Sequence, residues 1–319
     1  MRFILLIFFL IPLAVHSQCC SGGVPIASSL GLSSIEKNKI EFLISYDYNR
    51  LNQLFNNNVK LGDNSRLRNT HSFLTEINYG INKKLFMSGL FSIVRQERKI
   101  TRETENFTAT NGVGDALFLL KYGLLSYSTD HKSELLLGIG VKAPLGRSDL
   151  TDNGINLPAD LQPGSGAWDV IFWNYFSKGF NTIPNFNINT AITYRLTGTN
   201  SNYLSSLTYK FGNELQVIAG SNYRLNLNSL LTDILLSFKF RNQTHDLINA
   251  SVFPNSGGKF LFVIPGININ FSPQISLKLT SDIPLYRFVD GTQLTTSNRF
   301  SIGFNYTPTK PSKNESNRL

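Results

Sequence analysis

The stretch Arg299-Phe-Ser-Ile-Gly-Phe-Asn-Tyr306 alternates strictly between two kinds of residue. Phe300, Ile302, Phe304 and Tyr306 share one parity, and small or polar residues lie between them. Because successive side chains of a strand point to opposite faces, this stretch predicts a strand with one apolar and one polar face. Such a strand suits a water-soluble sandwich, whose core takes the apolar face. It also suits a transmembrane barrel, with lipid outside and a polar lumen inside.

The same alternation recurs along the chain, and the repeats decide between these two settings. Twelve segments are predicted to be strands: 39–49, 71–80, 85–97, 113–125, 133–144, 167–179, 186–197, 214–224, 230–241, 259–271, 275–287 and 299–306. The segment 167–179 alternates poorly, so its sequence does not define which of its residues face inward.

The connections between these segments alternate between long and short. Polar loops are predicted at 50–70, 98–111 and 145–166, and short turns at 81–84 and 272–274. Outer-membrane barrels have even strand numbers, short periplasmic turns and long external loops. The sequence therefore predicts an all-β fold, a transmembrane antiparallel up-and-down barrel of about 12 strands in which the last strand pairs with the first. A soluble sandwich accounts for the alternation but not for the loop asymmetry.

The composition agrees with a barrel that shows apolar surface to lipid. Charged residues make up only 16% of the 319 residues, and aromatic residues make up 12%. Soluble domains average roughly 25% charged residues. The formal net charge of +9 indicates an anion-attracting lumen or solvated loop lysines, and the aromatic–polar alternation does not indicate nucleic-acid binding.

The first residues indicate export from the cytoplasm. Arg2, an apolar run and the small or β-branched residues Val15 and Ser17 predict a signal peptide at 1–17. The mature protein is predicted to lie in the outer membrane of a Gram-negative bacterium. Its chain is predicted to divide into three parts. These are a short periplasmic segment at 18–38, the barrel at 39–307 and a polar tail at 308–319. Outer-membrane lipid is the expected partner.

Both cysteines lie in the segment at 18–38, at Cys19 and Cys20. Adjacent cysteines bond each other only with strain, so they do not form a fold-stabilising framework. They are candidate metal ligands or a redox pair, and the alternative is a mobile pair without a chemical role.

No motif predicts an enzyme or a cofactor. His71, His131 and His245 are scattered over a strand end, a turn and a loop, and their spacing does not indicate a hydrolase triad. Gly112-Val-Gly-Asp115 is similar to a nucleotide-binding turn, but a strand and not a helix is predicted to begin there.

The polar faces of the predicted strands supply the candidate site, because in a barrel they line the lumen. Two alternatives stay open: charged residues that filter solutes in a conducting lumen, or opposite charges that pair and fill a narrow interior. The loop at 145–166 is long enough to fold inward as a constriction, although a solvated loop fits equally well. The candidate lumen-lining residues are Glu41, Asp47, Glu76, Asp115, Lys121, Glu134, Lys142, Asp169, Arg195, Arg224, Lys239, Lys278, Asp282 and Arg299.

Several motifs, in order along the chain, resemble the outer-membrane transporter family of the meta-pathway of phenol degradation. The resemblance spans about 112–306 and implies a β-barrel that takes small, often hydrophobic molecules across the outer membrane. It carries over no site residues. The motifs are Gly112-Val-Gly-Asp115 with the following Leu-Lys-Tyr, Gly140-Val-Lys-Ala-Pro-Leu-Gly146, Leu161-Gln-Pro-Gly-Ser-Gly-Ala-Trp-Asp169, Pro254-Asn-Ser-Gly-Gly-Lys-Phe-Leu-Phe262, Ile283-Pro-Leu-Tyr286 and Asp290-Gly-Thr-Gln-Leu294.

Together these features predict an outer-membrane channel or transporter for passive passage of small, hydrophobic or aromatic molecules. The alternative is a non-conducting barrel that acts as a scaffold, or as a periplasmic metal or redox docking protein through Cys19 and Cys20.

Overall fold

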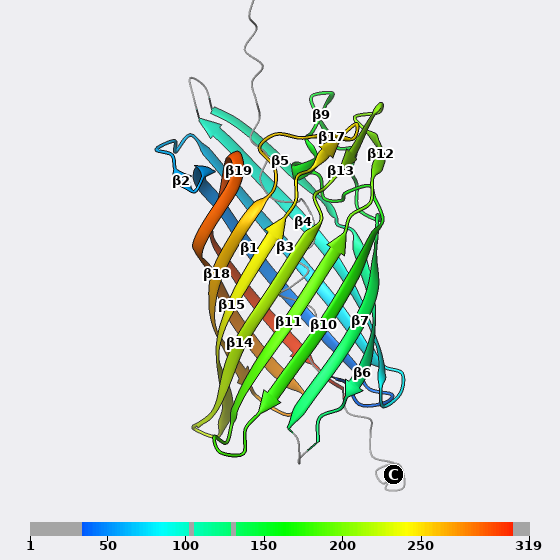
Figure 1. Ribbon diagram of the computed structural model, residues 1–319, viewed down its shortest axis with the longest axis vertical. Helices are drawn as coiled ribbons and strands as arrows, with labels where there is room; N and C mark the ends of the chain where they lie inside the picture. Colours follow the sequence, from blue (N-terminus) through cyan, green and yellow to red (C-terminus); the bar gives the residue numbers. More distant parts are fainter. Residues whose placement is uncertain (1–33, 102–104, 129–131, 309–319) are drawn as a thin grey trace, which may run out of the picture.

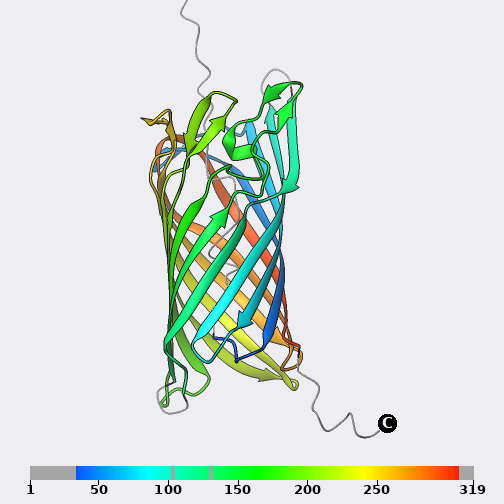
Figure 2. The ribbon, with the colours of Figure 1, turned by 90° about the vertical axis from the view of Figure 1, so that its right-hand side faces the viewer.

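The computed structural model describes residues 34–101, 105–128 and 132–308, and these form a closed antiparallel β-barrel (Figures 1 and 2). Eleven elements make the wall. Each pairs with the next, and the last, β19, also pairs with the first, β1. In chain order they are β1 (Ile40–Asn57), β3 (Arg66–Gly80), β4 (Leu85–Thr101), β6 (Ala116–Leu125), β7 (Ser133–Ala143), β10 (Asp169–Gly179), β11 (Phe186–Leu196), β14 (Glu214–Leu227), β15 (Leu230–Gln243), β18 (Gly258–Asn270) and β19 (Ile275–Tyr306).

The element β19 crosses the wall twice. Its first half, from Ser276 to Val289, pairs with β18, and its second half, up to Tyr306, pairs with β1. Gly291 has a φ of 77° at the bend, and the Thr307 N–H donates to the Gln274 carbonyl at 2.9 Å, which joins the two ends. Counting β19 as two strands gives the predicted twelve, and the predicted pairing of the last strand with the first is confirmed.

Short connections gather at one end of the barrel and long ones at the other (Figure 1). The start of β1 and the end of β19 both lie at the end with the short turns, because the Asn38 N–H donates to the Gly80 carbonyl and the Thr307 N–H to the Gln274 carbonyl. The long connections carry the remaining elements, which are β2 (Val59–Lys60), β5 (Glu105–Val113), β8 (Thr151–Asp152), β9 (Ile155–Asn156), a 3₁₀ turn η1 (Ala159–Leu161), β12 (Asn200–Tyr203), β13 (Leu207–Lys210), β16 (Leu247–Ile248) and β17 (Ser251–Val252).

Two predicted loops turn out to be largely strand. β1 and β3 extend into the predicted loop 50–70, and β4 and β5 occupy most of the predicted loop 98–111. These extensions lie at the end with the long connections. Their sequences are rich in polar residues and lack a regular apolar outer face, which a strand that rises above the bilayer does not need. Apolar alternation, the signal used for prediction, is therefore missing there.

The outer face of the barrel is apolar over successive cross-strand rows. Tyr46 pairs with Phe73, Phe73 with Ile93 and Ile93 with Val113, and all four side chains are exposed. The intervening residues, such as Ser72, are buried inside. No helix in the described ranges is long and apolar enough to cross a membrane. A closed barrel with an exposed apolar belt is the architecture of multi-pass outer-membrane proteins, and we assign the chain to that architecture and membrane.

Candidate functional site: the barrel lumen

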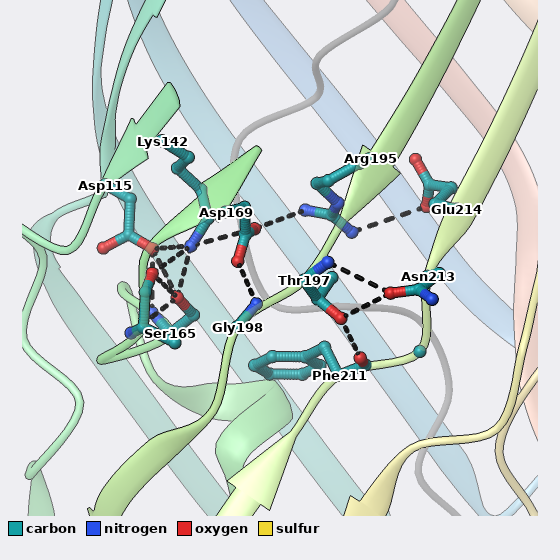
Figure 3. A network of polar contacts seen from close by, with 12 residues as sticks. Asp115, Lys142, Ser165, Asp169, Arg195, Thr197, Gly198, Phe211, Asn213 and Glu214 are labelled. Carbon is teal, nitrogen blue, oxygen red and sulfur yellow. Dashed lines mark hydrogen bonds and ion pairs between the residues drawn. The ribbon is translucent and has the colours of Figure 1, made fainter. Parts of the chain in front are cut away.

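A row of alternating charges follows the inner wall near the end with the long connections (Figure 3). We call these residues the ion-pair ladder, and neighbouring strands supply them in turn. The ladder consists of Asp115, which precedes β6, Lys142 on β7, Asp169 on β10, Arg195 on β11, Glu214 on β14 and Arg241 on β15.

Cross-strand register sets the ladder's spacing. Lys142 pairs with Asp169 across β7 and β10, and Arg195 pairs with Glu214 across β11 and β14. The N–O distances are 2.7 Å from Lys142 to Asp115, 3.2 Å from Lys142 to Asp169, 4.0 Å from Arg195 to Asp169 and 3.7 Å from Arg195 to Glu214. Arg241 reaches Glu214 at 2.8 Å. Each contact joins adjacent strands, so the ladder lines the wall instead of spanning the lumen.

Lys142 is the centre of this network. Its Nζ also donates to the Ser165 hydroxyl and to the Ala167 carbonyl, the latter at 3.0 Å. The side chain is only 3% exposed. A buried ammonium is tolerated when opposite charges and acceptors surround it, and Lys142 meets both conditions.

Other predicted lumen residues form smaller groups on the inner face. Lys239 pairs with Asp282, and the Arg299 guanidinium lies 2.8 Å from Asp47. Arg224, on the same inward parity but about half exposed at the short-turn end, pairs with Asp233 at 2.6 Å. These pairs join β15 to β19, β19 to β1 and β14 to β15.

The remaining five predicted residues lie in the half of the lumen toward the short turns. Glu76 is within electrostatic reach of Lys121 and Lys278. Glu41 accepts hydrogen bonds from Asn78 at 3.2 Å and Asn305 at 2.8 Å. Glu134 accepts one from the Ser34 N–H at 3.1 Å. All fourteen predicted residues thus have positions on the inner face, and their role in lining a passage stays a prediction.

Prediction missed several polar partners. Glu214 and Arg241 complete the ladder, and Asp233 pairs with Arg224. Arg241 has the same parity as Lys239 on β15, so strict alternation could have identified it. Arg68 was missed because it lies in a stretch predicted to be a loop.

An apolar stripe covers another part of the inner face, so the apolar side chains of these strands do not all face lipid. The members are buried and contiguous. The stripe consists of Leu74, Phe86, Leu90, Leu117, Leu119, Leu136, Ile171, Trp173, Tyr175 and Ala191, on β3, β4, β6, β7, β10 and β11.

Local sequence explains both the stripe and the failure to predict it. β6 reads Ala-Leu-Phe-Leu-Leu from Ala116 to Leu120 and is apolar on both faces, so alternation alone cannot tell which side is inside. The β10 segment was irregular in prediction for the same reason, since Ile171 and Trp173 face inward. Gly140 leaves room for the stripe, because a Cβ there would lie 2.8 Å from Cδ1 of Leu119.

The connection 145–166, which we call the inward loop, folds into the barrel and contacts the ladder. Its η1 turn is fully buried. Arg68 on β3 holds Asp160 with an N–O distance of 2.7 Å, and the Thr110 hydroxyl donates to the Leu161 carbonyl at 2.7 Å. The Ser165 hydroxyl donates to Asp115 at 2.8 Å and joins the loop to the ladder. Of the two predicted positions of this loop, inward and solvated, the structure shows the inward one, and its role as a constriction stays a prediction.

Two further long connections pack over the inward loop. Tyr203 and Tyr209 have ring centroids 4.8 Å apart and form an apolar cluster with Ala159. The buried Asp246 carboxylate accepts hydrogen bonds from the Tyr209 hydroxyl at 2.5 Å and the Gly212 N–H at 2.7 Å. Burial raises the pKa of Asp246, although these hydrogen bonds oppose the shift. The three connections together form a cap.

The described residues do not group three or more His, Cys, Asp or Glu side chains as a metal site. Cys19, Cys20 and His131 lie outside the described ranges. The His71 ring bonds the Tyr46 hydroxyl through Nδ1 on the outer face, and His245 lies 3.6 Å from Asp290 in the cap region. The two described histidines therefore lie in different parts of the barrel and do not share a site.

Comparison with known proteins supports the fold. No protein-family model matches the chain, and no curated protein matches it. Among solved structures, an outer-membrane channel from Pseudomonas putida F1 superposes with a TM-score of 0.70 at 11% identity, covering 87% of this chain and 98% of that one. A Pseudomonas aeruginosa FadL homologue is less similar, with a TM-score of 0.41 at 10% identity, covering 84% and 90%.

Proposed function

We propose that this barrel is an outer-membrane passage for small hydrophobic or aromatic molecules. The apolar stripe is the observation that carries the proposal. Lipid requires apolar side chains on the outer face only. The stripe instead places Leu119, Trp173 and their neighbours on the inner face, where a wet pore would have polar groups. Similarity to a channel of known structure supports passage, and the resemblance to phenol-pathway transporters supports the aromatic class.

The free energy of binding that the stripe offers an apolar solute is of the size that passage requires. Burial of apolar surface gives about 25 cal/mol per Å², so a ring-sized solute that buries roughly 100 Å² gains about 2.5 kcal/mol. Such binding is strong enough to draw the solute from water and weak enough to release it. The ladder offers ions little binding energy, because Lys142 is already paired with the Asp115 and Asp169 carboxylates.

The proposal is transport and not catalysis. A hydrolase needs a nucleophile and a base that converge on one reacting atom. His71 lies on the outer face and His245 in the cap, and each has a partner of its own. The alternative of a metal or redox docking protein depends on Cys19 and Cys20, and it stays a prediction.

Uptake of an apolar fluorescent probe by intact Gram-negative cells tests the proposal, because their outer leaflet resists such probes. We expect faster uptake in cells that produce the protein. The variant Leu90→Gln with Leu119→Gln should lose this gain, and Leu90→Met with Leu119→Met should keep it. Folded protein at equal amounts, shown by heat-modifiable migration, is the control. Equal uptake by the glutamine and methionine variants would exclude the stripe as the path.

A further inference from the structure

The outer face of β1, β3 and β4 carries a polar group directly beside the apolar belt. The neighbouring rows define the boundary. Tyr46, Phe73 and Ile93 form the last apolar row, and the next row contains Tyr48, His71 and Arg95. Arg50 pairs with Asn69 one row further. We call Tyr46, Tyr48, Arg50, His71 and Arg95 the rim patch.

Alternation places these side chains outside the barrel. Arg50 and Arg95 are exposed, with the Arg95 side chain at 58%. Their neighbours of opposite parity, such as Ser72 and Gln96, are 2% and 1% exposed inside the barrel. The patch lies toward the end with the long connections, which in outer-membrane barrels is the external end. It therefore meets the outer leaflet at the level where acyl chains give way to headgroups.

The patch is ordered by contacts among its own members. The Tyr46 hydroxyl and His71 Nδ1 are 2.7 Å apart, and the Tyr48 and His71 ring centroids are 5.1 Å apart. The Tyr48 hydroxyl donates to Asn69 at 3.1 Å. When Tyr46 donates to Nδ1, His71 keeps a proton on Nε2 and can donate it outward. Aromatic rings at this level suit the interface between acyl chains and headgroups.

The charges of the patch fit an anion. Arg95 shares its guanidinium with Glu97, at 2.8 Å from Nη2 to Oε1, and keeps other N–H groups for a ligand. Further out, Lys99 and Glu105 pair at 2.8 Å. The Arg50 carbonyl accepts a hydrogen bond from the Ser297 hydroxyl at 2.9 Å, and no ion pair or side-chain hydrogen bond is found for the Arg50 guanidinium among the described residues. Two guanidinium groups beside an aromatic pair match a phosphate joined to an apolar body.

We propose that the rim patch binds the phosphate group of a phosphorylated glycolipid of the outer leaflet. Arg50 and Arg95 contact the phosphate oxygens, His71 adds a donor, and Tyr46 and Tyr48 pack against the root of the acyl chains. Anionic lipid headgroups attract clustered Lys and Arg side chains at membrane surfaces. This site lies outside the lumen, so it stands apart from transport.

Native mass spectrometry of the purified, delipidated barrel tests this site. The probes are a phosphorylated glucosamine-disaccharide lipid and its enzymatically dephosphorylated form. We expect the wild-type barrel to retain the phosphorylated lipid in preference. R50Q with R95Q should weaken retention roughly ten-fold or more, because two charge-assisted contacts are lost. K259Q, which removes an exposed cation on the outer face of β18, should leave retention unchanged.

Two results of the lipid comparison would overturn the proposal. One is equal retention of the two lipids by the wild-type barrel, a comparison that needs no variant. The other is unchanged retention by R50Q with R95Q in a barrel that still migrates as folded. Inorganic phosphate added as a competitor separates the two sources of phosphate: displacement of the lipid by low phosphate concentrations would show a free-anion site and also contradict a lipid site.

Discussion

Individual buried charges in this barrel are held by their neighbours. Lys142 has two carboxylates within 3.2 Å and two further acceptors around its Nζ. Removal of one member of such a group leaves the others buried and unpaired, which costs more than the pair itself contributes. The ladder thus requires all of its members.

Lys142→Met should therefore lower the free energy of unfolding by about 3–5 kcal/mol. Asp115→Asn with Asp169→Asn should recover part of this loss in the same chain, because both unpaired carboxylates become neutral. Guanidinium-induced unfolding of the refolded barrel measures the change, and Lys178→Met, at an exposed position of β10, is the matched control. A Lys142 effect no larger than that of Lys178 would contradict the ladder.

At the residue scale, alternation indicates the inward-facing side chains where one face of a strand is polar, and it cannot do so where both faces are apolar. Alternation around Lys142 and Arg195 placed their side chains inside without any structure. Leu117 and Leu119 could not be assigned in this way, because Phe118 and Leu120 between them are equally apolar. Only the register with β4 and β7 decides which of them face the lumen.

Among the elements, the inward loop contacts the inner wall at several points. Its contacts with β3, β5 and the ladder hold it inside the mouth, through Arg68, Thr110 and Asp115. The length of the loop permitted this position, but tertiary contacts select it. Arg68 lies on a strand extension that alternation could not reveal, so the sequence could not show which residue holds the loop.

Arg68→Ala should release the inward loop and open the mouth to ions. The buried Asp160 would lose its guanidinium partner and favour an exposed position in water. Single-channel recording in a planar bilayer should show conductance several-fold above that of the wild type. Arg147→Ala, at an exposed position of the same loop, is the control. Identical conductance of Arg68→Ala and wild type would show that this contact does not hold the constriction.

The cap should lose stability as pH rises. Burial raises the pKa of Asp246 above its ordinary 3.8, so the folded cap binds this proton more tightly than the unfolded cap. Its contribution is greatest below pH 3.8, declines between that value and the raised pKa, and then levels off. Hydrogen exchange of 197–213 should increase over this window in the wild type. Asp246→Asn should remove the dependence, and its persistence there would assign it to another group.

The whole molecule combines a predictable barrel with a less predictable interior. Strand number and closure followed from local alternation and loop lengths, and β19 confirms the closure on β1. The division of the inner wall into the ladder and the apolar stripe arises from packing between strands distant in the sequence. At this scale the central claim is that apolar solutes enter the lumen and contact the stripe.

Trp173 offers the most direct test of that claim, because the chain has only two tryptophans and the other, Trp168, is exposed. In Trp168→Phe, fluorescence reports on the stripe alone. The measurement is quenching of Trp173, in vesicles of unlabelled lipid, by a small brominated aromatic and by its sulfonated analogue. We expect saturable quenching by the apolar compound only. Equal quenching by both compounds, or by neither, would contradict an apolar passage through this barrel.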